Sequence, residues 1–153
     1  MDPKHRRELE TRKNNALTGF VDSLRYLINA AYAKNTKDSD FEWYKNAYAV
    51  AATTNPEEII RKAGPPLWDH REEIESRDAN YFLKSDFVDD FAKHRDKGIP
   101  DEMDHERVLI RKIKLVWHLF SESERSKIGD KFNDAVTHLA VYMKSLREER
   151  DYD

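Results

Sequence analysis

The sequence contains no cysteine, few glycines and prolines, and no long apolar run. Of its 153 residues none is Cys, four are Gly and five are Pro. Without cysteine there are no disulfide bonds, thiolate metal sites or cysteine nucleophiles. With glycines only at 19, 64, 98 and 129, the chain has no glycine-rich phosphate-binding loop, and it matches no serine-hydrolase, zinc-protease or EF-hand signature. We therefore expect a protein that is not an enzyme and holds no cofactor.

The apolar residues are numerous but scattered. No stretch approaches the roughly 18–20 consecutive apolar residues of a membrane-spanning helix, and the N-terminus lacks the apolar run of a signal peptide. Hydrophobic residues make up 39% of the chain and charged residues 37%, with a net charge of −3. This composition supports a core inside a charged surface rather than disorder. It predicts an intracellular, cytoplasmic protein without a membrane partner.

Apolar residues recur every three or four positions, which is helical spacing, and no strand-like alternation is present. The sequence predicts an all-α fold, a compact single-domain bundle of about five to seven helices over residues 1–153. Three apolar stripes define its scaffold: Leu17, Phe20, Val21, Leu24, Ile28 and Ala31; Leu109, Ile110, Ile113, Val116, Trp117 and Phe120; and Ile128, Phe132, Ala135, Val136, Leu139, Tyr142, Met143 and Leu146. Trp117 and Phe132 are expected in the core. Residues 1–16 and 147–153 are expected to fray or project, because they carry few apolar side chains.

Capping residues and prolines predict the helix boundaries. The second helix starts at Asp38 or Ser39, and Asn55 caps the third, which has Pro56 at its first position and Glu58 in a capping box. The run Gly64-Pro65-Pro66 is expected to end that helix. A segment from 67 to 94 follows, with a break near 78–80 or Ser85. Acidic residues at 101, 102 and 104 start the next helix, and a Ser121–Glu124 capping box starts the last.

Aromatic residues concentrate in the middle third of the chain, in greater number than a small core usually takes up. Some of them are therefore expected at the surface, where aromatic side chains beside a stiff turn form anchors for protein partners. Packing in the core is the alternative for each of these residues. The candidate protein-binding residues are Trp43, Tyr44, Pro65, Pro66 and Trp68.

Two basic clusters define an alternative function, binding to nucleic acid. Residues three, four or seven apart share a helix face, which lets basic side chains follow a row of phosphates. The clusters are Lys4, Arg6, Arg7, Arg12 and Lys13 near the N-terminus, and Arg107, Arg111 and Lys114 in the penultimate helix. The acidic overall balance and the absence of a nucleic-acid-reading signature oppose this alternative.

Histidine and carboxylate residues at spacing i, i+4 are the pattern closest to a metal site. The pairs are Asp90–His94, Asp101–His105 and Asp134–His138. Each pair supplies two ligands, whereas a site needs three or four that converge. Adjacent carboxylates such as Glu72 and Glu73 point about 100° apart on a helix and do not share a proton. No metal ligand or catalytic residue is therefore assigned, and a metal-dependent enzyme is the third alternative.

Three short motifs carry a resemblance to a known family. They are Asn55-Pro56, the segment Ile74-Glu75-Ser76-Arg77-Asp78-Ala79-Asn80-Tyr81-Phe82-Leu83, and the helix end Trp117-His118-Leu119-Phe120-Ser121. In these features the chain resembles an uncharacterised all-helical family encoded by large DNA viruses. The resemblance implies a viral accessory or virion-associated protein and names no catalytic residue.

Overall fold

The computed structural model describes residues 2–76, 78, 80–81, 90–91, 93–95, 100 and 103–152. Within these ranges the chain is all-α and has no strand, which confirms the predicted fold class. The elements are α1 (Pro3–Tyr32), α2 (Ser39–Thr54), α3 (Pro56–Asp69), α4 (Arg71–Glu75), α6 (His105–Val116), the 3₁₀ turn η3 (Trp117–Leu119) and α7 (Glu122–Tyr152). The predictions that concern Phe82, Ser85, Asp101 and Glu102 lie outside the described residues.

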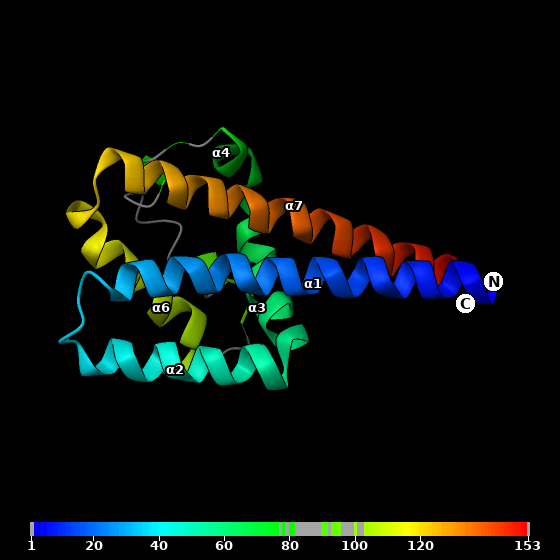
Figure 1. Cartoon of the computed structure of the whole chain (residues 1–153), viewed down its shortest axis with the longest axis horizontal. Coiled ribbons are helices and arrows are strands. Elements are labelled where there is room, and N and C mark those ends of the chain that lie inside the picture. Colours follow the sequence, from blue (N-terminus) through cyan, green and yellow to red (C-terminus); the bar gives the residue numbers. More distant parts are fainter. Residues whose placement is uncertain are drawn as a thin grey trace.

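Helices α1 and α7 form the scaffold. They run antiparallel and make the most extensive helix–helix contact of the described chain, so both chain ends lie at the same end of the molecule (Figure 1). Helix α2 lies on the opposite side of α1 from α4 (Figure 1). Helices α3 and α6 each pack against both α1 and α2. The three predicted apolar stripes meet in one core.

The core contains the residues that the helical spacing predicts. Trp117 and Phe132 are each 1% exposed, and every residue of the first two stripes is buried. Tyr48 of α2 donates a hydrogen bond of 2.6 Å to the carbonyl of Val21, which joins α2 to α1. Burial raises the pKa of Tyr48 far above its usual range. The third stripe is buried only as far as Leu139.

The two ends of the chain extend beyond the rest of the bundle as a paired helical arm (Figure 1). Leu9 is 1% exposed. Arg12 Nη1 lies 3.2 Å from a carboxylate oxygen of Glu148, and Lys13 Nζ lies 2.8 Å from one of Glu149. The hydrogen bond with Glu149 raises the pKa of Lys13. The described parts of both end segments are therefore helical and joined to each other by ion pairs.

The helix starts are set by side-chain caps in most cases. The predicted Ser121–Glu124 capping box is present, with distances of 2.9 and 3.2 Å. Asp38 caps α2 by accepting from the Phe41 N–H at 3.0 Å. The capping box predicted between Asn55 and Glu58 is wrong, because the side chain of Asn55 makes no capping hydrogen bond. Its intended partner Glu58 instead pairs with Arg61 and Lys62, and charged donors are stronger partners than a neutral N–H.

Candidate protein-binding groove

Helix α3 continues through the Gly64-Pro65-Pro66 run, so the predicted stop is wrong. Pro66 has no N–H, and the carbonyl of Lys62 therefore loses its helical donor. The guanidinium of Arg95 replaces that donor, with Nη1 2.9 Å from the Lys62 oxygen. The helix extends one more turn, to Asp69, and Leu67 in this turn is buried. That last turn carries the side chain of Trp68.

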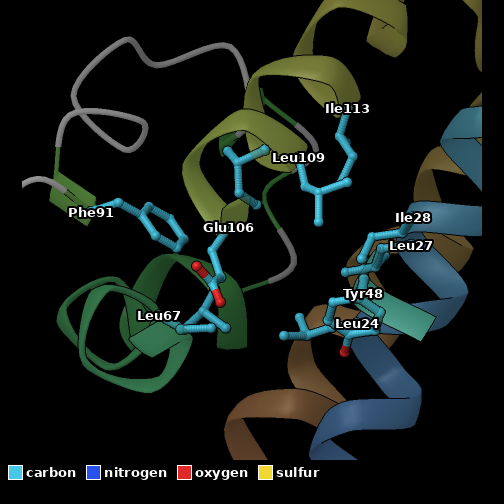
Figure 2. A pocket seen from close by; sticks show the side chains of 11 residues that line it. Leu24, Leu27, Ile28, Tyr48, Leu67, Phe91, Glu106, Leu109 and Ile113 are labelled. Atoms are coloured by element: carbon cyan, nitrogen blue, oxygen red, sulfur yellow. The ribbon is translucent and has the colours of Figure 1, made fainter. Parts of the chain in front are cut away.

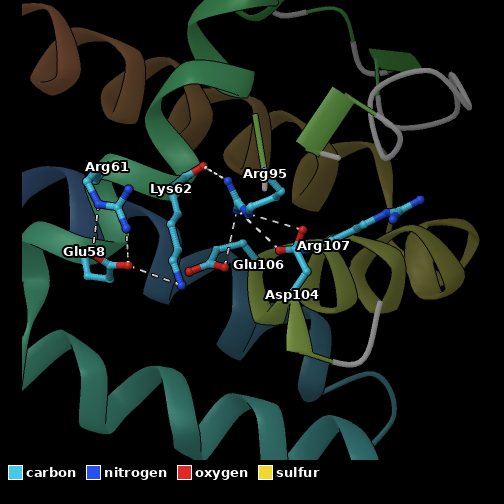
Figure 3. Close-up of polar contacts among 7 residues, drawn as sticks. All are labelled: Glu58, Arg61, Lys62, Arg95, Asp104, Glu106 and Arg107. Atoms are coloured by element: carbon cyan, nitrogen blue, oxygen red, sulfur yellow. Dashed lines mark hydrogen bonds and ion pairs between the residues drawn. The ribbon is translucent and has the colours of Figure 1, made fainter. Parts of the chain in front are cut away.

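The same arginine ties α3 to α6. The side chain of Arg95 is 9% exposed, and its Nε lies 3.3 Å from Asp104 while Nη2 lies 3.5 Å from Glu106. Asp104 also caps α6 by accepting from the Arg107 N–H at 3.2 Å. Figure 3 shows how these side chains converge between the two helices. This network fixes the position of α3.

Two glycines bring other helices close to α7. A Cβ added at Gly64 would lie 3.0 Å from Leu139 Cδ1, and one added at Gly19 would lie 2.5 Å from the ring of His138. A side chain at either position would force the facing side chain of α7 to move. Helix α3 therefore sits tightly on α7 at Gly64 and Leu139.

A groove of about 520 Å³ opens beside this crossing, between α3 and the C-terminal part of α7. Its floor is apolar, with Ile60, Gly64 and Leu139 all buried. Its walls combine aromatic, aliphatic and charged side chains. The lining residues are Glu57, Ile60, Arg61, Gly64, Pro65, Trp68 and Asp69 of α3, and Leu139, Tyr142, Met143 and Leu146 of α7.

The rim of the groove carries charges that have no partner among the described residues. Within that part of the chain, Glu57 on the α3 wall is exposed and makes no ion pair, and Arg147 and Arg150, which continue the α7 wall, are also exposed and unpaired. The neighbouring Glu148 and Glu149 pair with Arg12 and Lys13 of α1, and Glu149 also lines the surface beside the two arginines. The groove therefore has an acidic wall at α3 and a basic continuation along α7.

The structure divides the five predicted protein-binding residues between two places. Pro65 and Trp68 line the groove, whereas Pro66 is buried and does not line it. Trp43 and Tyr44 instead make edge-to-face contacts with each other and with His105 of α6, at centroid distances of 5.0 to 5.4 Å. Trp43 is 58% exposed.

The α7 wall of the groove was not predicted as a site. Tyr142, Met143 and Leu146 belong to the third apolar stripe, which was expected to pack within the scaffold. Tyr142 and Met143 are only partly buried, and Leu146 is 36% exposed. The only signal in the sequence is that this stripe continues almost to the charged C-terminal segment.

The two basic clusters lie at opposite ends of the molecule. Lys4, Arg6 and Arg7 are exposed at the tip of the arm, whereas α6 lies at the far end of the bundle (Figure 1). Arg12 and Lys13 are engaged by α7 carboxylates. The three residues of the second cluster are on α6 and each is partly buried: Arg107, Arg111 and Lys114. The clusters do not form one continuous surface.

Histidine and aspartate side chains pair between the end of α3 and residues 90 and 94. His94 Nε2 lies 2.8 Å from Asp69, and His70 contacts Asp90. Burial favours the neutral form of Asp90, but hydrogen bonds from Lys93 and His70 outweigh it and lower the pKa. Each member of the predicted Asp90–His94 pair thus has a different partner at the end of α3: Asp90 contacts His70, and His94 contacts Asp69. In the described ranges no three such side chains converge as metal ligands do.

A second cavity lies inside the bundle and measures about 30 Å³. Its walls are apolar except for Tyr48 and Glu106, and Figure 2 shows Glu106 entering between Leu67 and Phe91. A space of this size holds about one water molecule. It is a packing gap and not a ligand site.

No family model matches the chain, and no curated protein or solved structure matches it either. No helix among the described residues combines the length and the hydrophobicity needed to cross a membrane.

Proposed function

We propose that this chain is a non-enzymatic protein-binding module, and that the groove between α3 and α7 holds an amphipathic helix of a protein partner. The observation that carries the proposal is the apolar floor at Gly64 and Leu139, flanked by the partly exposed Trp68 and Leu146. Grooves of this kind bind helices through apolar side chains at i, i+3 or i+4 and i+7. Aromatic side chains at the edge of such a groove contribute much of the binding energy.

The dimensions of the groove suit a short helix. The α3 wall runs from Glu57 to Trp68, about 17 Å at 1.5 Å per residue, which accommodates about three helical turns. The charges lie on the rim and do not converge on the floor. Catalytic sites and cofactor sites need convergent polar groups, so this arrangement favours binding over chemistry.

The rim charges define the chemistry of the partner. Glu57 calls for a basic residue beside the apolar stripe of the bound helix, and Arg147 and Arg150 call for acidic residues. Charges at an interface rim select the partner and its direction more than they add affinity.

The test is selection of helical peptides from a randomised display library on the full chain. We expect enrichment of peptides that carry an apolar stripe with a basic residue near one end and acidic residues near the other. We expect the Leu146→Glu variant to lose binding to these peptides. Leu115→Glu is the matched control, because Leu115 is 65% exposed on α6 and lies outside the groove. Selected peptides that bind Leu146→Glu as well as the unmodified protein would overturn the proposal.

The viral accessory or virion role that the resemblance implies stays a prediction, as does nucleic-acid binding by the basic residues. Retention on DNA or RNA that falls as salt rises is the measurement that detects the nucleic-acid alternative.

A further inference from the structure

We infer that the helix held in the groove comes from a second copy of this chain. In the resulting symmetric dimer, the α7 wall of each copy lies in the groove of the other. This inference rests on the proposed function, because it names the partner of the same groove. In a two-fold interface the same patch of both copies must be complementary to itself. The groove meets this requirement in its apolar residues and in its charges.

The apolar requirement is met by α7. A helix that fills the groove needs apolar side chains at i, i+3 or i+4 and i+7. Four α7 residues follow that spacing, and the last three are only partly buried within their own chain: Leu139, Tyr142, Met143 and Leu146. In the dimer the α7 stripe of each copy, centred on Leu146, lies against Pro65 and Trp68 of the other.

The charges meet the requirement as well. In the described part of each copy, an acid without an ion pair, Glu57, stands on the α3 wall, and two such bases, Arg147 and Arg150, stand on the α7 wall. When α7 of one copy lies along α3 of the other, the bases of each copy come to the acid of its mate. The two-fold axis repeats this pairing, so the rim charges of both copies form ion pairs across the interface.

The shape of the arm allows this arrangement. The α1–α7 arm extends beyond the other helices (Figure 1), so the C-terminal part of α7 is accessible to α3 of a second copy. Glu148 and Glu149 are already paired with Arg12 and Lys13, so Arg147 and Arg150 keep their charge for the second copy even though Glu149 lines the same surface. The α3 and α7 helices of the two copies then form a four-helix arrangement, a common way for amphipathic helices to associate.

The experiment is the molar mass of the full chain by light scattering after size exclusion, with sedimentation equilibrium for the dissociation constant. We expect twice the 18.1 kDa of one chain. Leu146→Glu should give a monomer that keeps its helical circular dichroism, and the control Leu115→Glu should stay dimeric. The mass of a single chain for the unmodified protein at about 100 μM, a concentration that populates even a weak specific dimer, would overturn the inference.

A charge exchange tests the pairing itself. Glu57→Arg alone, or Arg147→Glu with Arg150→Glu, should each raise the dimer dissociation constant about tenfold, and the combination should restore it. A dimer that survives Leu146→Glu, or a combination that restores nothing, contradicts this interface.

The two proposals fail in different ways. If the unmodified chain is monomeric while library peptides still bind and are lost in Leu146→Glu, self-association fails and the proposed function stands. If the chain is dimeric and no foreign peptide binds, the groove serves only the second copy.

Discussion

The carbonyl oxygen of Lys62 accepts a hydrogen bond from Nη1 of Arg95 at 2.9 Å. In an uninterrupted helix this carbonyl would accept from the N–H of residue 66, which is proline. Arg95 therefore supplies from outside the helix the donor that the proline lacks. The proline pair and the arginine act as one structural unit, and this unit places Trp68 at the groove.

The first prediction concerns Arg95. Arg95→Ala removes the guanidinium from the buried Asp104 and the partly buried Glu106 and should lower the free energy of unfolding by about 3–5 kcal/mol. Urea denaturation followed by circular dichroism measures this loss. In a Pro66→Ala background the new backbone N–H can donate to the Lys62 carbonyl. Arg95→Ala should therefore lower the free energy of unfolding by about 1 kcal/mol less in this background. Equal losses in both backgrounds would show that the Lys62 contact contributes nothing.

The second prediction compares two glycines that both lie inside helices. Gly19→Ala places a Cβ 2.5 Å from the His138 ring and should destabilise the protein by about 1–3 kcal/mol. Gly129→Ala meets no atom within 4 Å and should stabilise it by about 0.5–1 kcal/mol, through helix propensity alone. Melting temperatures of the two variants give the comparison. A His138→Ala background should remove most of the Gly19→Ala loss.

The third prediction concerns pH and the capping box of α7. A hydrogen bond from the Ser121 N–H, together with Lys34, lowers the pKa of Glu124 from 4.5 to about 2. A carboxylate whose pKa is depressed by folding contributes stability above pH 4.5, and that contribution is lost as the pH falls towards 2. Glu124→Gln should flatten the fall in stability over this range. The measurement is denaturant unfolding at several pH values, and identical pH profiles would contradict the prediction.

The fourth prediction concerns the arm. Leu9 is fully buried there, so Leu9→Ala should cost about 2–5 kcal/mol, as in a core. Thr11→Ala, two residues on and exposed, should change stability by less than about 0.5 kcal/mol. Thermal unfolding of both variants distinguishes a docked arm from a loose one. Equal melting temperatures would mean that the arm is loose.

Local spacing predicted most of the fold. The buried stripes around Phe20, Ile113 and Phe132 follow from helical periodicity, and the Ser121–Glu124 cap follows from residues that are neighbours in the chain. The continuation of α3 through Pro65 and Pro66 could not be predicted, because the donor that repairs the helix lies 29 residues away, from position 66 to position 95. Long-range repairs of this kind leave no mark on local sequence.

The site was predicted in part. Proline and tryptophan are typical of anchoring surfaces, which identified Pro65 and Trp68 as candidates. Trp43 and Tyr44 belong to the same third of the sequence but pack against His105 of a different helix. The α7 wall was missed because periodicity shows which face of a helix is apolar, but not how far along its length another helix covers it.

The pairing of the first and last described helices has a consequence for the time course of folding. Contacts such as Arg12–Glu148 close a loop of 136 residues, and loops of this length slow the search for the native topology. During synthesis α1 leaves the ribosome long before α7 exists, and the part of α1 that packs on α7 stays uncovered meanwhile. Helical bundles built from local contacts fold within microseconds to milliseconds, and we expect slower folding here because the most extensive helix–helix contact of the described residues joins the two ends of the chain.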